Sequence, residues 1–251
     1  MTTRLELLPD VYLTAVQTSR FKTACFSLSF LRPLRQEEAG MNALLPSVLL
    51  RGSESAPSIR AIADRLDAPC GASVGSPLRK EGEIQLTGLF ADGLEDRYAG
   101  EPVFSRLLEL TAELLLRPRT QGGVFVPQIV MQERQKLLDT IESTLDDKAE
   151  YCQTQLLRQM CRGEAYAVGR LGEAGPLAAV DEAALWAHYQ KVLASSRAEL
   201  FYLGSKPAQE VAALLRPLLK DLPRGACLPV STAPGPQPKA LRRTQERLPL
   251  A

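Results

Sequence analysis

The sequence has a single histidine, His188, so any chemistry that needs an imidazole depends on that residue. Upstream, Gly71-Ala72-Ser73-Val74-Gly75 fits the Gly-x-Ser-x-Gly pattern of a serine nucleophile, and acidic residues lie between it and His188. That pattern works where a strand precedes the serine and a helix follows it. Here a predicted helix, residues 58–66, precedes Ser73 and predicted strands follow. A serine hydrolase that uses Ser73 is therefore kept only as an alternative.

The remaining candidate groups do not combine into a metal or cofactor site. His188 lies on a predicted helix beside aromatic residues, and one imidazole cannot hold a zinc ion, so we expect it to be packed or solvated. Asp146 and Asp147 are neighbours on a helix and point to different faces. The glycines in residues 169–175 lack the spacing of a dinucleotide-binding loop. We expect no bound metal and no cofactor.

Composition narrows the classes of protein to consider. Of the 251 residues, 45% are apolar and 24% are charged, which is typical of a folded globular protein. The net charge of +1 gives no reason to expect a nucleic-acid partner, and no apolar run approaches the roughly 20 residues of a membrane span. The five cysteines are an odd number and form no Cys-x-x-Cys pair. We therefore expect free thiols in a reducing cytoplasm, with no membrane association.

Hydrophobic periodicity predicts a mixture of strands and helices. Alternating and β-branched stretches predict strands at residues 11–16, 23–31, 72–77, 82–90 and 199–203. Apolar residues at helical spacing predict helices at residues 37–50, 57–66, 104–116, 181–193 and 209–219. Pro46 lies inside the first of these helices and should kink it, because proline lacks the N–H that a helix needs.

A long helical stretch runs from Pro127 to Cys161 without a glycine or a further proline. Ser143 and Asp146 have the spacing of a helix N-cap, so two helices are expected to meet there. The apolar residues of the stretch recur at nearly heptad spacing, at Leu137, Ile141, Leu145, Cys152, Leu156 and Met160. We interpret this stripe as core packing and keep a coiled-coil partner surface as the alternative.

The segment from Gly40 to Ser53 resembles the active-site helix of the inverzincins, the insulinase-like or pitrilysin family of zinc peptidases. In that family a glycine precedes His-x-x-Glu-His, and an apolar run leads to a basic residue, Gly and Thr or Ser. The two His bind zinc and the Glu polarises the attacking water. With the alignment anchored on Gly40 and on Arg51-Gly52-Ser53, the three positions are occupied by Ala43, Pro46 and Ser47. A methyl group, a proline ring and a serine hydroxyl are not a zinc-binding set.

Further segments resemble the same family in the same order. Glu133-Arg134 is similar to the start of the family's Glu-Arg-x-x-x-x-x-Glu helix, and Thr140 stands where that helix supplies the third zinc ligand. The resemblance therefore implies a site without its metal ligands. The runs at residues 141–143 and 160–164 look closest to a non-catalytic bacterial branch of processing-type peptidases, which is associated with elongation factor P modification.

The resemblance implies an α/β (α+β) fold, a mixed twisted sheet with helices packed on one face, similar to the processing peptidases. Units of this family usually occur in tandem. We therefore expect residues 1–221 to form one non-catalytic unit, and residues 222–251 to be a Pro- and Gly-rich linker with the truncated start of a second.

The function implied is that of a catalytically inactive peptidase-family protein. It would pair with an active zinc-peptidase homologue, or with itself as a dimer, to bind or process a peptide. Peptides in this family dock by adding a strand, and the matching stretch here is Gly71, Ala72, Ser73, Val74 and Gly75. A plain strand start is the alternative interpretation of that stretch. A scaffold or interaction protein with no peptide substrate is the alternative function.

Overall fold

The computed structural model of the protein describes residues 1–67, 71–144 and 146–230. Its central sheet contains β1 (Thr2–Leu8), β2 (Val11–Gln17), β3 (Thr23–Pro33), β4 (Ser73–Gly75), β5 (Arg79–Glu81), β6 (Ile84–Leu94) and β9 (Arg197–Gly204). The strands lie in the order β1-β2-β9-β3-β6-β4, and β5 also pairs with β6. β2 and β9 are parallel, whereas the other neighbouring strands are antiparallel, so the sheet is mixed.

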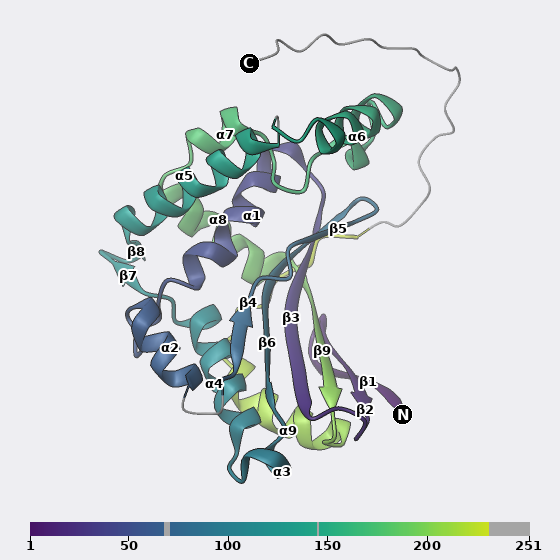
Figure 1. Cartoon of the computed structure of the whole chain (residues 1–251), viewed down its shortest axis with the longest axis vertical. Helices are drawn as coiled ribbons and strands as arrows, with labels where there is room; N and C mark the ends of the chain where they lie inside the picture. The colour runs from purple at the N-terminus through teal and green to yellow at the C-terminus, as the bar shows by residue number, and fades with distance from the viewer. Residues whose placement is uncertain (68–70, 145, 231–251) are drawn as a thin grey trace.

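The helices gather on one face of this sheet (Figure 1). The longer ones are α1 (Gln36–Leu49), α2 (Ile59–Asp67), α4 (Val103–Leu116), α5 (Pro127–Ser143), α6 (Lys148–Met160), α8 (Glu182–Ser195) and α9 (Ala208–Leu219). The short elements are α3 (Asp96–Ala99), η1 (Ala165–Ala167), α7 (Ala174–Ala178) and a hairpin of β7 (Thr120–Gln121) and β8 (Val124–Phe125). The mixed α/β fold with helices on one face agrees with the prediction.

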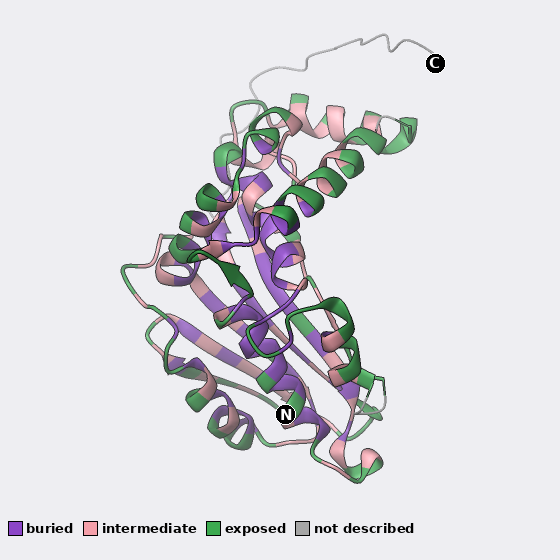
Figure 2. Ribbon diagram, turned by 90° about the vertical axis from the view of Figure 1, so that its left-hand side faces the viewer, coloured by how far each residue is buried: buried purple, intermediate pink, exposed green. Residues whose placement is uncertain are grey.

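Burial along the central strands alternates, as a sheet covered on one face requires. In β3 the even-numbered residues from Ala24 to Arg32 are buried, whereas most of the residues between them are partly accessible. Figure 2 shows the same alternation as purple and pink bands along the strands. The covered face packs on α1, α4, α8 and α9 around Phe30, Phe104 and Tyr202. Among the residues that the structure describes, the other face of the sheet carries no helix (Figure 1).

The predicted strands and helices are present, and β1, β5, the β7–β8 hairpin, α3 and α7 are additions that were not predicted. β9 lies between β2 and β3, so strands that follow each other in sequence are separated in the sheet. α6 begins after Asp147 instead of Ser143, because the Asp147 carboxylate accepts hydrogen bonds from the backbone N–H groups of Ala149 and Glu150, both at 3.0 Å. Such a cap satisfies N–H groups that have no partner within the helix.

The core-packing interpretation of the long stripe is right for one helix and wrong for the other. Leu137 and Ile141 of α5 pack against the core. Cys152, Leu156 and Met160 of α6 are exposed, because no element packs on that side of the helix among the described residues. Leu145 lies outside the described residues.

Residues 222–230 lie against the domain as far as the structure describes them. Leu222 is buried, and the backbone N–H groups of Gly225 and Leu228 donate to Ala194 and Ser195 at the end of α8, both at 2.8 Å. The expected second unit remains a prediction, since residues 231–251 are not described. No helix within the described ranges is long and apolar enough to cross a membrane.

Candidate functional site

The helix pair that resembles a zinc site is formed by α1 and α5, which pack against each other. Arg51, just after α1, donates to the Glu133 carboxylate of α5 and, at 2.9 Å, to the side chain of Gln132. Two residues that carry the family resemblance, Arg51 and Glu133, thus bond to each other. Because this ion pair joins the two helices directly, their arrangement does not depend on a shared metal ion.

The side chains at the positions of the three zinc ligands and the catalytic Glu cannot bind a zinc ion. Ala43 and Pro46 are buried and have no side-chain lone pair, and Ser47 is half-buried. Thr140 is exposed, and its hydroxyl donates to the Lys136 carbonyl at 2.8 Å. Within the described ranges, no three His, Cys, Asp or Glu side chains are grouped as a metal ion would require. The arrangement cannot activate a water molecule by the family's zinc mechanism.

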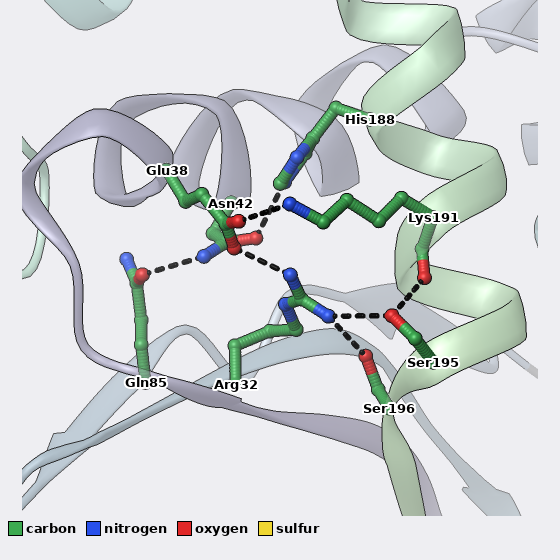
Figure 3. A network of polar contacts seen from close by, with 8 residues as sticks. All are labelled: Arg32, Glu38, Asn42, Gln85, His188, Lys191, Ser195 and Ser196. Atoms are coloured by element: carbon green, nitrogen blue, oxygen red, sulfur yellow. Dashed lines mark hydrogen bonds and ion pairs between the residues drawn. The ribbon is translucent and has the colours of Figure 1, made fainter. Parts of the chain in front are cut away.

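A buried polar network lies beside these positions and centres on Asn42 of α1 (Figure 3). Asn42 Nδ2 donates to Gln85 Oε1 of β6 at 2.8 Å. Its Oδ1 therefore faces His188 of α8, and the His188 Nε2–H donates to it over 2.7 Å. Asn42 thus joins the sheet to two helices. His188 was expected to be either packed or solvated. It is packed, and it takes part in this network rather than in a metal site.

Pro46 explains a second bond to Asn42. In a helix the N–H of residue 46 would donate to the carbonyl of residue 42, but proline has no N–H. The Thr87 hydroxyl of β6 donates to the Asn42 carbonyl instead, at 2.7 Å. α1 continues through Pro46 to Leu49. Pro46, at the position of the family's catalytic Glu, thus leaves the Asn42 carbonyl without a helical donor, and the Thr87 hydroxyl takes that place.

Arg32 and Glu38 form a buried ion pair next to Asn42 (Figure 3). Arg32 is fully buried, and its guanidinium lies 2.5 Å from the Glu38 carboxylate, which also accepts from Lys191 at 2.6 Å. Burial alone would raise the pKa of Glu38, but hydrogen bonds from Lys191 and Arg32 outweigh it and lower that pKa to about 2. Arg32 also donates to Ser195 at the end of α8 and to Ser196 just after it, so the pair fixes α8 to the sheet.

A loop closes over the network through a backbone contact. The loop that contains Gly172 crosses α1 at Gly40, and a Cβ on Gly172 would lie 2.5 Å from the Gly40 nitrogen. Gln85 Nε2 donates to the Arg170 carbonyl of the same loop at 2.7 Å and to the Ala39 carbonyl of α1 at 3.0 Å. Glycine is required at residue 172 because its φ of +76° also disfavours a side chain.

The predicted docking stretch lies at one edge of the sheet. β4 pairs with β6 on one side and is the outermost strand of the described sheet on the other. Gly71 and Ala72 precede it, and Ala72 is buried in a small cluster with Ala91 and Leu107. The Ser73 hydroxyl donates to the Asp92 carboxylate, whereas His188 is bonded to Asn42, so the two candidate hydrolase residues are not paired. Ser73 opens an edge strand and no nucleophile elbow.

Removing the Thr87 hydroxyl tests the role of Pro46. We expect Thr87→Val to lower the free energy of unfolding by about 1–3 kcal/mol, because the buried Asn42 carbonyl loses its donor. In a Pro46→Ala background the cost should be smaller by about 1 kcal/mol, since the substituted alanine can donate its backbone N–H to that carbonyl. Urea unfolding of the parent protein, of the two single variants and of the double variant measures the coupling between Thr87 and Pro46.

Thr111→Val is the matched control for this cycle. Its buried hydroxyl donates to the Leu107 carbonyl at 2.7 Å inside α4, where that carbonyl also has a helical N–H partner. Thr111→Val should lower the free energy of unfolding less than Thr87→Val does, and its effect should be the same in the Pro46→Ala background. Equal coupling of both threonines to Pro46 would contradict the assignment.

Because of His188, the free energy of unfolding should decrease as pH falls from about 6.5 towards 4. Burial lowers its pKa from 6.5 to about 4, with a smaller opposing effect of Glu38, so the unfolded chain takes up the proton first. Stability is complete above pH 6.5 and is lost as pH falls towards 4, by roughly 2 kcal/mol between pH 7 and 5. The depressed carboxyl pKa of Glu38 acts below pH 4.5, outside that range.

His188→Gln keeps a donor for Asn42 and removes the only imidazole of the chain. Urea unfolding from pH 7.5 to 5 should show a flatter profile for this variant than for the parent protein. A variant that retains the parent slope would show that another group titrates there.

Comparisons with known proteins supply the family. No protein-family model matches the sequence. The chain is 31% identical over 198 residues to the probable inactive metalloprotease YmfF of Bacillus subtilis (strain 168), covering 78% of this chain and 46% of that protein. It therefore spans about half the length of the relative it matches. The link to elongation factor P modification is not tested by this match and stays a prediction.

Two solved structures share the fold. A conserved protein from Enterococcus faecalis superposes with a TM-score of 0.83 at 25% identity, over 92% of this chain and 56% of the other. The inactive domain of an M16 peptidase from Pseudomonas fluorescens gives a TM-score of 0.74 at 16% identity, over 94% of this chain and 54% of the other. With its metallopeptidase fold and without the His-x-x-Glu-His ligands, this chain belongs to the inactive M16-like peptidase family.

Proposed function

We propose that this chain is a non-catalytic unit that pairs with a second M16-like unit and encloses a chamber for a peptide. The observation that carries the proposal is the bare face of the sheet, which ends at the open edge strand β4 (Figure 1). The partner favoured is an active zinc-peptidase homologue, because Ala43, Pro46, Ser47 and Thr140 leave this chain without the family's zinc chemistry.

Apolar side chains on the bare face favour a partner there. Ser27 of β3 is in register with Phe90 of β6 and with Phe201 of β9, so the two rings lie on the same face on either side of β3. They are 36% and 38% exposed. Exposed aromatic residues grouped in this way are typical of interaction surfaces. α1 is a poorer candidate for the contact, since all its apolar residues except Met41 are buried in the core of this unit.

The length of the relatives supports pairing. The chain covers 46% of YmfF, 56% of the Enterococcus faecalis protein and 54% of the Pseudomonas fluorescens one. Each of these proteins therefore has room for a second part of similar size. The partner unit is either a further part of the same polypeptide or a separate chain.

Within the described sheet the outer edge of β4 is unpaired, which suits a peptide in extended conformation. An unpaired edge strand presents backbone N–H and C=O groups that a peptide can pair with as an added strand. Gly71 to Gly75 carries no side chain larger than Val74, so little obstructs that approach. We place the complex in the cytoplasm, which is consistent with the free thiols of Cys25, Cys152, Cys161 and Cys227.

Pairing is tested with an active homologue from the same genome, one with an intact His-x-x-Glu-His. We expect co-purification with the parent chain and at least tenfold weaker binding with Phe90→Glu or Phe201→Glu, because each places a charge in the contact. Ile59→Glu is the control, since Ile59 is 56% exposed on α2, a helix of the covered face. A failure of the parent to bind would favour the scaffold alternative.

Peptide docking is tested by hydrogen exchange on the paired complex with a casein digest as the probe. Amides of residues 71–75 should exchange more slowly when the digest is added, because an added strand pairs with them. The opposite edge strand, β1, is the matched control, as it pairs only with β2 in the described sheet. No change at β4, or equal protection of both edges, would contradict a specific peptide site.

A further inference from the structure

α6 differs from the other long helices because none of its residues is buried. Figure 1 shows it at the top of the domain, extending beyond the end of α5. Its inner side faces the segment that contains η1, and Arg158 lies 4.0 Å from Glu173 there. Within the described ranges, the main contact of α6 is therefore with the η1 segment on its inner side.

The outer side of α6 is an uncharged stripe. Its centre is Leu156, which is 58% exposed, and Met160 is 64% exposed. At 100° per residue, Ala149, Cys152, Leu156 and Met160 fall within about 40° of one line along the helix. Gln153 and Gln159 border them, and all six residues are exposed. We name these six residues the α6 stripe.

The α6 stripe reads nearly the same in both directions from Leu156. Cys152 and Met160 lie four residues to either side, and Gln153 and Gln159 lie three residues to either side. A two-fold contact between identical helices brings a surface against its own copy, reversed in direction. An antiparallel pair centred on Leu156 therefore places apolar residues against apolar residues and glutamines at the border, with no charge in the seam.

We propose that the α6 stripe is a contact between two copies of this chain, packed as antiparallel helices with Leu156 on the two-fold axis. The symmetry of the stripe favours a second copy over an unrelated protein, which would not require it. The surface is separate from the bare sheet face around Phe90 and Phe201, so the contact can join two peptide-chamber units. One 13-residue helix offers less than the roughly 800 Å² per partner of a stable interface, so the contact alone is weak.

Site-specific cross-linking tests the geometry. Helices packed about 9 Å apart bring the two residues at the axis within disulfide reach. In a background with Cys152→Ser and Cys161→Ser, we expect Leu156→Cys to form a disulfide-linked dimer at least tenfold faster than Gln153→Cys under mild oxidation. Copies of residue 153 are separated by about 9 Å along the helix axis as well as by the distance between helices, so they stay out of reach.

Sedimentation of the full chain at rising concentration gives the second measurement. Leu156→Glu should abolish the association shown by the parent, whereas Gln159→Glu at the border should weaken it less. Equal cross-linking at positions 153 and 156, or a parent that stays monomeric, would overturn the α6 contact. A dimer that survives Leu156→Glu but is lost with Phe201→Glu would also overturn it, while leaving the pairing through the sheet face intact.

Discussion

The buried amide of Asn42 is the contact on which the arrangement of α1, α8 and the sheet depends. Its side chain bonds to Gln85 and His188, and its carbonyl accepts from Thr87. Buried polar groups are costly when they lack a partner, so each member of this network is held by the others. Any shift of α1 along the sheet would break several of these bonds together. The position of α1 is thus set by hydrogen bonds as well as by apolar packing.

The network gives a physical account of how the helix pair of a metal site persists without the metal. A zinc ion bound by two helices cross-links them and contributes to folding. Here Arg51 and Glu133 join α1 to α5, and the Arg32–Glu38 pair with Lys191 joins α1 and α8 to the sheet. These contacts replace a metal cross-link with direct bonds between side chains. The fold can therefore be retained while the zinc ligands are absent.

Local sequence signals were sufficient where structure is set by near neighbours. Asp181 caps α8 through a 2.7 Å bond to the Ala184 N–H, and most helices and strands occur where periodicity places them. The alternation in β6 also indicated a strand correctly. It did not reveal that Gln85 and Thr87 lie on the covered face, because their burial depends on partners in α1.

The candidate network could not be assembled from sequence because its members are far apart in the chain. Asn42 is 43 residues from Gln85 and 146 residues from His188. The available signals were the only histidine and Arg32, a charged residue one position beyond the predicted strand 23–31. Neither specifies a partner. The stripe along α5 and α6 was misjudged for a related reason, since periodicity shows that a helix has an apolar side but not which neighbour covers it.

The separation between the buried network and the accessible surfaces bears on how such a protein can change its function. Phe90, Phe201 and the α6 stripe are accessible to solvent, whereas Arg32, Asn42 and Gln85 lie between the sheet and its helices. Substitutions at accessible positions usually change stability little, whereas loss of a buried polar partner costs several times more. Residues at the sheet face, at the β4 edge and on α6, which are the surfaces proposed for partner contact, can therefore vary while α1 stays in place. Since Ala43, Pro46 and Ser47 provide no zinc ligand on α1, the surfaces proposed for partner contact are the bare sheet face, the β4 edge and the α6 stripe, whereas α1 holds the helices and the sheet together.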